Sequence, residues 1–456
     1  MNVTENSKGR AITGHFVAAF KDTGRILCLD ERLYVKSNEN IWHEVSDTKA
    51  VIEIRTFFKK EKSVTHALAT DIVKNLKTDP DIQIRPNVFQ HPKLLKVNNG
   101  IWDIQNQCII QNDNLKFDRK TDAYISEESV EESDVFNEFC RKIFTKENFE
   151  QKKKALYEII GFCISDTESV KKAIFLIGPP NCGKSVILRF IQRLIAEDHV
   201  SNVSLSNFSG RFNIVSMYDK VLNISGEVPS STLSGKALDV FKSITGGDKI
   251  ELERKGYQPF SGIVRAKLLF AGNLLPMFSN ADGTDSLTER LHVLIFDSSV
   301  EEAERDIHLE EKLWEQRDNI VYYALLALNN FIKCDKKFIV LEDEKQRLEA
   351  MKFAYKQIES FIDSYMDTGE DYYVSISSAY EAYLDFAYDE LLEPMKRSEF
   401  RNKMLLQPGI SISKTKKRFG NSNPQHCFKG IRFKKLYYKK QDTVLNDNKE
   451  DAKDVR

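Results

Sequence analysis

The chain has 456 residues, which predicts about three domains at roughly 150 residues each. Its 67 Lys and Arg nearly balance 68 Asp and Glu, and 41% of its residues are hydrophobic, so the composition is that of a soluble globular protein and excludes a mainly disordered one. No apolar run approaches the roughly 18 residues of a membrane span, and the seven cysteines include no Cys-x-x-Cys pair, which favours a reducing cytoplasm over a disulfide framework.

The first part of the chain, to about residue 125, alternates short apolar stretches with turn signals. It predicts an α+β module with strands at 25–29 and 32–35 and a helix at 63–76. An acidic, serine-rich run at 126–134 then interrupts the pattern and is interpreted as a linker. Helices are expected at 135–144 and 147–163.

Strands and helices alternate from 173 to 296, which is typical of a mainly parallel α/β domain. Two helices near 309–333 and 342–366 lead to a module of helices and a basic β-ribbon that ends near residue 440. In this module we expect a basic helix at 395–406 and, across 410–435, two strands flanking a loop at 414–418. The last residues, 441–456, are polar and are predicted to be disordered.

The strongest motif is the sequence Gly178-Pro-Pro-Asn-Cys-Gly-Lys-Ser185, which matches G-x-x-x-x-G-K-[ST]. Its glycines let the backbone N–H groups surround a phosphate chain, while the lysine reaches the β- and γ-phosphates and the serine hydroxyl ligates Mg²⁺. A buried-strand run at 173–177 precedes it, and apolar residues at helical spacing follow. Strand, loop and helix N-terminus are therefore in the order that nucleoside triphosphate binding requires.

Two further strands end in polar side chains. The run 221–227 ends in Glu227, which can polarise the water that attacks the γ-phosphate, and 267–273 ends in Asn273, which can orient the same water. A surface Glu at an ordinary strand end is the alternative. Between these strands, 244–260 reads as a β-hairpin whose tip carries Arg254 and Lys255. Such a tip suits a nucleic-acid backbone, although a basic surface turn would have the same pattern.

Charge is unevenly distributed near the C-terminus. Residues 355–395 contain ten acidic residues and one basic residue, whereas 395–440 contain fourteen Lys and Arg and one acid. Aromatic residues interleave the second stretch, so it favours a phosphate-contacting surface over a merely solvated basic face.

The succession of motifs resembles the superfamily 3 helicases, AAA+ ATPases of viruses, phages and mobile elements, in their phage/plasmid and poxvirus primase-helicase branch. It resembles in particular the replication initiator helicases of staphylococcal pathogenicity islands and related mobile elements. The segments that carry the resemblance are Gly178–Ser185, 223–227, 245–248, 268–273, 283–285 and 289–291, with 97–103 and 156–163 ahead of the ATPase.

The resemblance implies an α/β fold with an AAA+ P-loop core, an α+β N-terminal accessory domain and a C-terminal winged-helix domain. The implied boundaries are 1–130 for the accessory domain, 131–168 for a helical collar, 169–300 for the ATPase core, 301–368 for a helical lid, 369–440 for the winged helix and 441–456 for the tail.

The same resemblance implies roles for individual residues, with ATP and Mg²⁺ as cofactors. Lys184, Glu227, Asn273 and an arginine finger, Arg290, would be catalytic, and Ser185 and Glu227 would hold the metal. The nucleotide would contact Gly178, Pro179, Pro180, Asn181, Cys182, Gly183, Lys184 and Ser185. DNA would contact Lys249, Arg254, Lys255, Lys396, Arg397, Arg401, Lys414, Lys416, Lys417 and Arg418.

These expectations describe a hexameric ring that moves 3′ to 5′ along single-stranded DNA and starts replication of a mobile element or phage in a bacterial cytoplasm. Its partners would be single-stranded DNA in the channel, double-stranded origin DNA and further copies of itself, with a primase or host replication proteins as candidates and no membrane. The alternatives are a helicase loaded by a separate initiator and an AAA+ DNA motor or remodeller without strand separation. Two positions depart from the pattern: Gly226 replaces a common acid, and Glu289 replaces a second arginine.

Overall fold

The computed structural model describes residues 2–434 except 62, 86, 169, 229–232, 234, 257, 277–286, 391, 393, 406, 408–409 and 419–422; for 2–11 and 353–356 it describes the helical backbone alone. The chain divides into two compact units. The first unit contains Met1–Ser230, Lys236–Pro276 and His292–Leu341, and the second contains Ser231–Gly235, Met277–Leu291 and Glu342–Arg456. The predicted motif at 283–285 and the predicted tail at 441–456 lie outside the described residues.

The first unit begins with a small α+β region, as the sequence predicted. Its elements are α1 (Asn2–Lys21), β1 (Ile26–Leu29), β2 (Arg32–Lys36), β3 (Trp42–Val45), α2 (Asp47–Phe57), α3 (His66–Thr78), η1 (Pro80–Ile82), β4 (Leu94–Val97), β5 (Gly100–Asp103) and β6 (Cys108–Ile110). The strands form two antiparallel sheets, β1-β2-β3 and β4-β5-β6. Helices α1 and α2 were not expected. Helix α2 buries only Ala50, Val51 and Ile54, so its sequence has too few regularly spaced apolar residues to indicate a helix.

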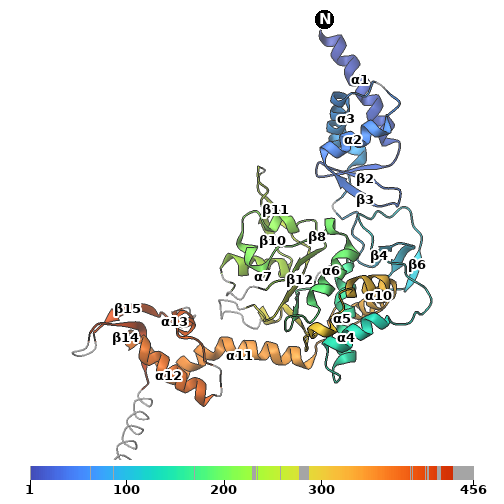
Figure 1. Ribbon diagram of the computed structural model, residues 1–456. Coiled ribbons are helices and arrows are strands. Elements are labelled where there is room, and N and C mark those ends of the chain that lie inside the picture. The colour runs from blue at the N-terminus through green and yellow to red at the C-terminus, as the bar shows by residue number, and fades with distance from the viewer. Residues whose placement is uncertain are drawn as a thin grey trace, which may run out of the picture. The chain divides into compact units, whose positions relative to one another are not determined.

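The central part of the unit is built on a five-stranded sheet in the order β13-β7-β12-β9-β8. Figure 1 labels β8 and β12 of this sheet. Its strands are β7 (Ala173–Ile177), β8 (Val200–Ser201), β9 (Leu222–Ser225), β12 (Lys267–Gly272) and β13 (Leu291–Ile295). β7 pairs in parallel with β12, β12 with β9, and β9 with β8. The expected parallel α/β architecture is therefore confirmed for this region.

Helices and a hairpin complete the unit. They are α4 (Asp134–Ile143), α5 (Phe149–Ile164), α6 (Lys184–Ile195), η2 (Glu197–His199), η3 (Leu205–Ser209), η4 (Ile214–Met217), α7 (Lys236–Gly246), β10 (Lys249–Leu252), β11 (Phe260–Ile263), η5 (Glu302–Glu304), α9 (Leu309–Glu315) and α10 (Arg317–Lys333). The helix expected at 309–333 is divided at Gln316, and residues 126–133 form neither helix nor strand.

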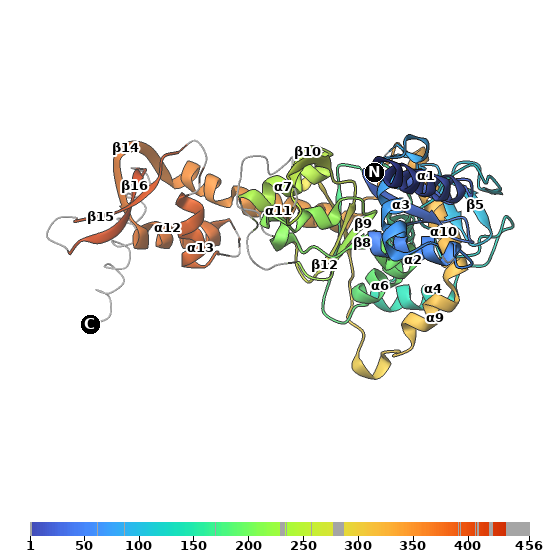
Figure 2. The same ribbon diagram turned by 90° about the horizontal axis from the view of Figure 1, so that it is seen from above.

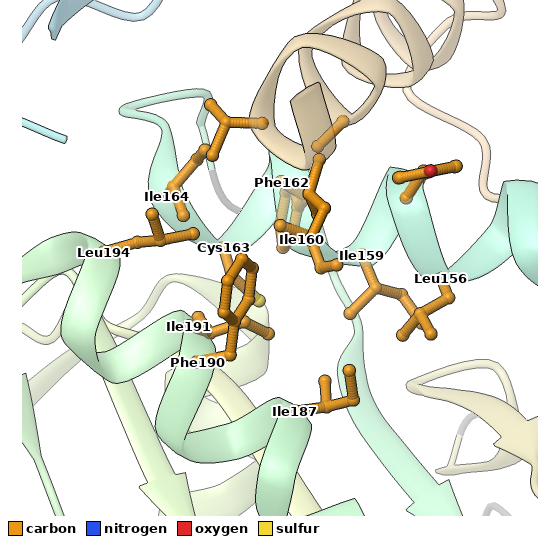
Figure 3. Packing of buried hydrophobic residues seen from close by; sticks show 14 of the residues in the cluster. Leu156, Ile159, Ile160, Phe162, Cys163, Ile164, Ile187, Phe190, Ile191 and Leu194 are labelled. Carbon is orange, nitrogen blue, oxygen red and sulfur yellow. The ribbon is translucent and has the colours of Figure 1, made fainter. Parts of the chain in front are cut away.

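Both faces of the central sheet are covered, which explains why all five residues of β7 are buried. Ile174 and Leu176 belong to the core shared with α5 and α6, whereas Phe175 stacks on Phe270 of β12 on the other face. Figure 3 shows the first of these cores, with side chains of α5 facing Ile187 and its neighbours on α6.

Helix α5 is buried along nearly its whole length between α6 and α10. At Gly161 an added Cβ would lie 2.2 Å from the carbonyl oxygen of Ala324, so α5 and α10 touch through their backbones there. Helix α5 precedes β7 in the chain and packs against α6, the two elements that flank the glycine-rich loop. It therefore supports the core next to that loop.

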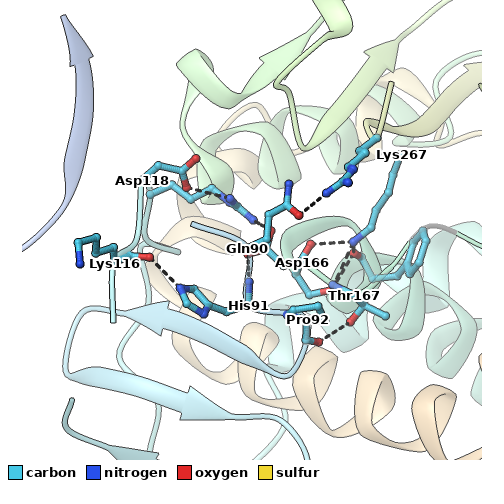
Figure 4. A network of polar contacts seen from close by, with 12 residues as sticks. Gln90, His91, Pro92, Lys116, Asp118, Asp166, Thr167 and Lys267 are labelled. Atoms are coloured by element: carbon cyan, nitrogen blue, oxygen red, sulfur yellow. Dashed lines mark hydrogen bonds and ion pairs between the residues drawn. The ribbon is translucent and has the colours of Figure 1, made fainter. Parts of the chain in front are cut away.

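A buried polar network ties the N-terminal region to the sheet (Figure 4). Asp166, just after α5, accepts hydrogen bonds from the guanidinium of Arg119 and from the His91 N–H at 3.1 Å. Burial alone would raise the pKa of Asp166, but the Arg119 charge overcomes this effect and lowers it. Lys267, the first residue of β12, donates to the carbonyl oxygens of Phe162 and Ser165. The network therefore fixes the start of β12 relative to the N-terminal region.

Within its described residues from Glu342 onward, the second unit contains the helices α11, α12 and α13 and a three-stranded antiparallel sheet in the order β14-β16-β15 (Figure 2). Its elements are α11 (Glu342–Tyr365), β14 (Met366–Ser375), α12 (Ile376–Asp389), α13 (Arg397–Leu405), β15 (Ser413–Lys417) and β16 (Gln425–Phe433). Tyr383 and Phe400 stack at 4.7 Å in its core, and Phe428 closes that core from the sheet.

One local expectation for this unit was wrong. The segment 414–418 was expected to be a loop between strands, but Ser413–Lys417 is itself strand β15, paired with β16 from Lys414↔Phe428 to Lys417↔Gln425. Strand pairing outweighs the low strand propensity of a lysine-rich segment because β15 is an edge strand, where exposed lysines are well tolerated.

Candidate functional site

The glycine-rich loop begins directly after β7, and α6 begins at Lys184. Gly183 occupies the N-cap position of α6 with φ +84°, and no side chain accepts from the first turn. An added Cβ at Gly183 would lie 2.4 Å from Cε2 of Phe139, a residue of α4. The loop thus needs glycine both for its left-handed conformation and for the close approach of an aromatic ring. It leaves the first N–H groups of a 12-residue helix available to an anion.

Lys184 lies inside the curl of the loop and is only 9% exposed. Its Nζ donates to the carbonyl oxygens of Gly178 at 2.9 Å and Pro179 at 2.7 Å, and lies 3.1 Å from the Sγ of Cys182. The ammonium group is therefore held against the backbone that would surround a phosphate chain. This arrangement supplies one concentrated positive charge beside the helix N-terminus.

The two predicted strand-end residues lie at the same edge of the sheet as the loop. In the strand register, Gly272 pairs with Ile177 and Phe270 pairs with Ser225, so the carboxyl ends of β7, β12 and β9 are level. Glu227 follows β9 by two residues, Asn273 directly follows β12, and both are exposed. The Gly178 N–H donates to the Gly272 carbonyl at 3.2 Å, which joins the loop to the Asn273 strand.

A pocket of 590 Å³ opens beside this edge, and most of its wall was missed by the sequence analysis. Besides the loop residues Asn181–Val186, it is lined by Val135, Glu138, Phe139, Lys142, Arg189, Val300, Glu304, Arg305, Asp306, Leu309 and Lys312. Helix α4 and the segment after β13 thus extend the site well beyond the phosphate loop. Neither segment carries a recognisable motif. Many combinations of apolar and charged side chains can line a pocket wall, so the sequence gives no specific signal for it.

Two backbone hydrogen bonds hold the segment after β13 in place, one to the loop and one to the end of α4. The Val300 N–H donates to the Asn181 carbonyl at 3.0 Å, and the Asp297 N–H donates to the Ile143 carbonyl at 2.9 Å. Asp297 also accepts from the fully buried ammonium of Lys152 at 2.6 Å, while the same ammonium donates to the Ile295 carbonyl at 2.9 Å. The pair joins α5 to the carboxyl end of β13, beside the loop.

A cationic hairpin was predicted at 244–260, and the structure has one at 249–263, in which β10 and β11 pair from Lys249↔Ile263 to Leu252↔Phe260 (Figure 1). Residues 244–246 are instead the end of α7. Arg254 and Lys255 are exposed in its turn, and the Arg254 guanidinium lies 5.9 Å from the centre of the Phe260 ring. Lys249 is exposed at the base of the hairpin. Glu253, next to the tip, accepts from Arg211, so the net positive charge of the tip resides on Arg254 and Lys255.

Arg290 directly precedes β13, whose other end lies beside the loop, since the Phe296 N–H donates to the Ile177 carbonyl at 2.7 Å. Five strand residues separate the two ends, roughly 16 Å at the usual rise per residue. Within one chain, Arg290 therefore belongs to the opposite edge of the sheet from Lys184.

The predicted cations of the second unit fall on two elements and their flanks. Lys396 precedes α13, which contains Arg397 and Arg401, and Lys414, Lys416 and Lys417 lie on β15, with Arg418 just after it. All are exposed except the half-buried Arg401. The ammonium of Lys417 lies 3.4 Å from the centre of the Tyr373 ring on β14.

Across the described part of the chain, no cluster of three or more His, Cys, Asp or Glu side chains could hold a metal ion. The predicted Mg²⁺ ligands, Ser185 and Glu227, are only two side chains, the first in α6 and the second two residues after β9. Mg²⁺ commonly takes one or two protein ligands and completes its shell with phosphate oxygens and water. Within the same described residues, no helix combines the length and apolarity needed to cross a bilayer.

The molecule is thus an α/β protein with a parallel sheet flanked by helices, an arrangement compatible with a P-loop core. Residues 176–290 match a family described as a family of unknown function (DUF5906), which covers the loop and the strand-end residues. No curated protein matches the chain.

Several solved structures are similar to it at low identity. The A form apo structure of the NrS-1 C terminal region is 12% identical with a TM-score of 0.48, and the likeness covers 91% of this chain and 98% of that one. The apo structure of NrS-1 C terminal region (305-718) is 13% identical with a TM-score of 0.48 at the same coverage. These values assign no activity, so the function rests on the site.

Proposed function

We propose that the protein is an ATP-driven DNA helicase of the superfamily 3 type, acting as a ring in the replication of a mobile element or phage. The observation that carries this proposal is the level arrangement of the glycine-rich loop, Glu227 and Asn273 at the carboxyl edge of one parallel sheet. Ligands of open α/β sheets bind at that edge, where the strand order reverses. Here β7 is an inner strand between β13 and β12, so the loop that follows it lies within that edge and not at its margin.

The residues support a division of labour in hydrolysis. The N–H groups of the loop and the Lys184 ammonium would bind the phosphates of ATP, and Ser185 with Glu227 would hold Mg²⁺, which neutralises phosphate charge when bound. Glu227, exposed and two residues beyond its strand, would take the proton from the attacking water, and Asn273 would orient that water. The wall of α4 and 300–312 would enclose the base and ribose.

Arg290 supports a ring because it directly precedes β13, at the end of that strand remote from the loop of its own chain. A guanidinium placed there would act on the γ-phosphate of a neighbouring subunit, so hydrolysis would depend on correct packing of the next copy. The hairpin with Arg254 and Lys255 would then grip single-stranded DNA in the channel through phosphate contacts.

The second unit supports a role in duplex binding. Its helices and three-stranded antiparallel sheet have the composition of the winged-helix module that the resemblance implies, and its exposed cations cluster on α13 and β15. We therefore assign double-stranded origin DNA to this unit. Deleting 395–456 should abolish binding to origin duplex while sparing basal ATP hydrolysis, and unchanged affinity for the element's own origin would refute the assignment.

The helicase is tested with forked duplexes that carry a single 3′ or 5′ tail. Wild type should unwind the 3′-tailed fork alone, and Lys184→Ala should lose both ATP binding and unwinding. Glu227→Gln is the matched control, because it should still bind ATP while failing to hydrolyse it. Hydrolysis stimulated by DNA without unwinding would indicate a loader-dependent helicase, and hydrolysis indifferent to DNA would favour a remodeller of another kind.

A further inference from the structure

The second unit contains an open pocket of 820 Å³ that the sequence analysis did not anticipate. Its walls are the first turns of α12 and α13 and the facing ends of β15 and β16. Arg397, Arg401 and Lys414 line it together with His426 and a group of serines that includes Ser377. Residues from four elements, far apart along the chain, thus converge on one concave surface.

The charge of this pocket has a single sign. Among the described residues that line it, three carry a permanent positive charge and none is acidic. Arg397 and Arg401 are four residues apart on α13 and therefore share a helix face. The acid of that helix, Glu399, pairs with Lys403 at 3.2 Å, and neither of these two residues lines the pocket.

Directional donors accompany the charges. Arg397 donates from Nη2 to the Ser377 Oγ at 2.5 Å, which links the first turns of the two helices. Ser375 caps α12 by accepting from the Ser378 N–H at 3.0 Å, and helix geometry leaves the N–H groups of Ile376 and Ser377 without an intrahelical acceptor. The serines Ser375, Ser377 and Ser378 thus line the same pocket as the three cations. This combination matches a tetrahedral oxyanion better than any neutral ligand.

We infer that this pocket binds a backbone phosphate of duplex DNA, and that Arg397, Arg401 and Lys414 position the duplex without reading its bases. The inference deepens the proposed function and rests on the duplex-binding role of the second unit. The inference assigns α13 a positioning role and not a base-reading role. Arginines in its first two turns that bind a phosphate are not available to contact base edges. Sequence preference would then come from other parts of the surface.

The test uses the full chain and fluorescence anisotropy with two duplexes of unrelated sequence, each over a series of NaCl concentrations. Arg401→Gln and Lys414→Gln should each weaken binding by about tenfold on both duplexes, and the slope of log K against log salt should become shallower by about one. Lys403→Gln is the matched control: it removes one positive charge from the same helix, outside the pocket, and should change affinity less than about twofold.

Other outcomes would overturn the inference. A loss confined to one duplex would mean that the arginine reads bases, and an equal loss in Lys403→Gln would mean that only the total charge matters. Blunt duplexes with and without a 5′-phosphate separate the two phosphate sources. Equal binding supports an internal phosphate, whereas dependence on the 5′-phosphate would make the pocket a site for strand ends.

Failure of the proposed helicase is distinguishable from failure of this pocket. Unwinding and ATP hydrolysis with and without DNA are measured on the same preparations, and basal hydrolysis should be unchanged in the Lys403→Gln control. If wild type does not unwind but the pocket variants alone lose duplex affinity, the pocket stands and the helicase fails. If wild type unwinds while the variants bind duplex as tightly as wild type does, the helicase stands and the pocket inference fails.

Discussion

Replacing Gly183 with alanine tests the contact between the glycine-rich loop and α4. The backbone of Gly183 has φ +84°, where a Cβ costs about 1–2 kcal/mol. The new Cβ would also lie 2.4 Å from Cε2 of Phe139, a side chain that is only 4% exposed, so the ring must move by roughly an ångström within a packed core. Overpacking of this kind costs about 1–3 kcal/mol more. We expect Gly183→Ala to lower the free energy of unfolding by about 2–5 kcal/mol in total.

Gly24→Ala is the matched control. Gly24 has φ +64° and nothing within 4 Å of an added Cβ, so it should incur the backbone cost alone. Urea denaturation followed by circular dichroism measures both variants, and titration with a fluorescent ATP analogue measures binding. The strain in Gly183→Ala also destabilises the loop conformation that binds phosphate, and about 1.4 kcal/mol of such strain corresponds to a tenfold higher Kd. Gly183→Ala should therefore bind the analogue at least about tenfold more weakly than wild type, whereas Gly24→Ala should bind it as wild type does.

A double variant isolates the overlap from the backbone cost. In a Phe139→Ala background the ring is absent, so Gly183→Ala should cost no more than the Gly24 control. Equal costs for Gly183→Ala and Gly24→Ala in the wild-type background would refute the packing argument. It would mean that the Phe139 ring yields to the added methyl group without measurable cost.

Three further predictions follow from the buried polar groups. Burial lowers the pKa of Lys267 to about 7, so above that pH the unfolded chain binds one proton more than the folded chain and folding becomes more favourable as the pH rises. Between pH 7 and 8.5 the free energy of unfolding of wild type should therefore rise by about 2 kcal/mol relative to that of Lys267→Met. A difference in stability between the two proteins that does not change with pH would contradict this. Asp297→Ala should cost about 3–5 kcal/mol in urea denaturation because it removes the carboxylate that pairs with the fully buried Lys152 ammonium, and the double variant with Lys152→Met should cost clearly less. Asn223→Leu should cost about 2 kcal/mol or more in the same assay, since its amide accepts from the Val203 N–H and donates to the Val203 carbonyl, both at 2.9 Å; an unchanged urea midpoint would contradict it.

The sequence motifs and periodicities anticipated much of the sheet region. The P-loop pattern, the buried run at 173–177 and the two strands ending near Glu227 and Asn273 are local signals, because each depends on residues adjacent in the chain. The structure has those strands, and their carboxyl ends lie at the same edge of the sheet. It also has the expected hairpin, formed by β10 and β11.

The same local signals failed where pairing partners decide the conformation. A lysine-rich stretch such as 414–418 has no intrinsic strand pattern, and it becomes β15 because β16 offers an edge. Likewise, nothing adjacent to Phe139 indicates that its ring contacts Gly183, since 44 residues separate them and only the packing of α4 against the loop brings them together.

By itself, the sequence determined the parallel α/β region, the glycine-rich loop with its lysine, and the strand-end carboxylate and amide, because spacing along the chain specifies each of them. Only the tertiary structure decided which surfaces complete the sites. The pocket beside the glycine-rich loop takes its second wall from α4 and 300–312, and the cationic pocket of the second unit takes its charges from α13 and β15. The physical reason is that a concave site depends on side chains that meet through packing, and packing joins segments whose separation along the chain leaves no periodic trace.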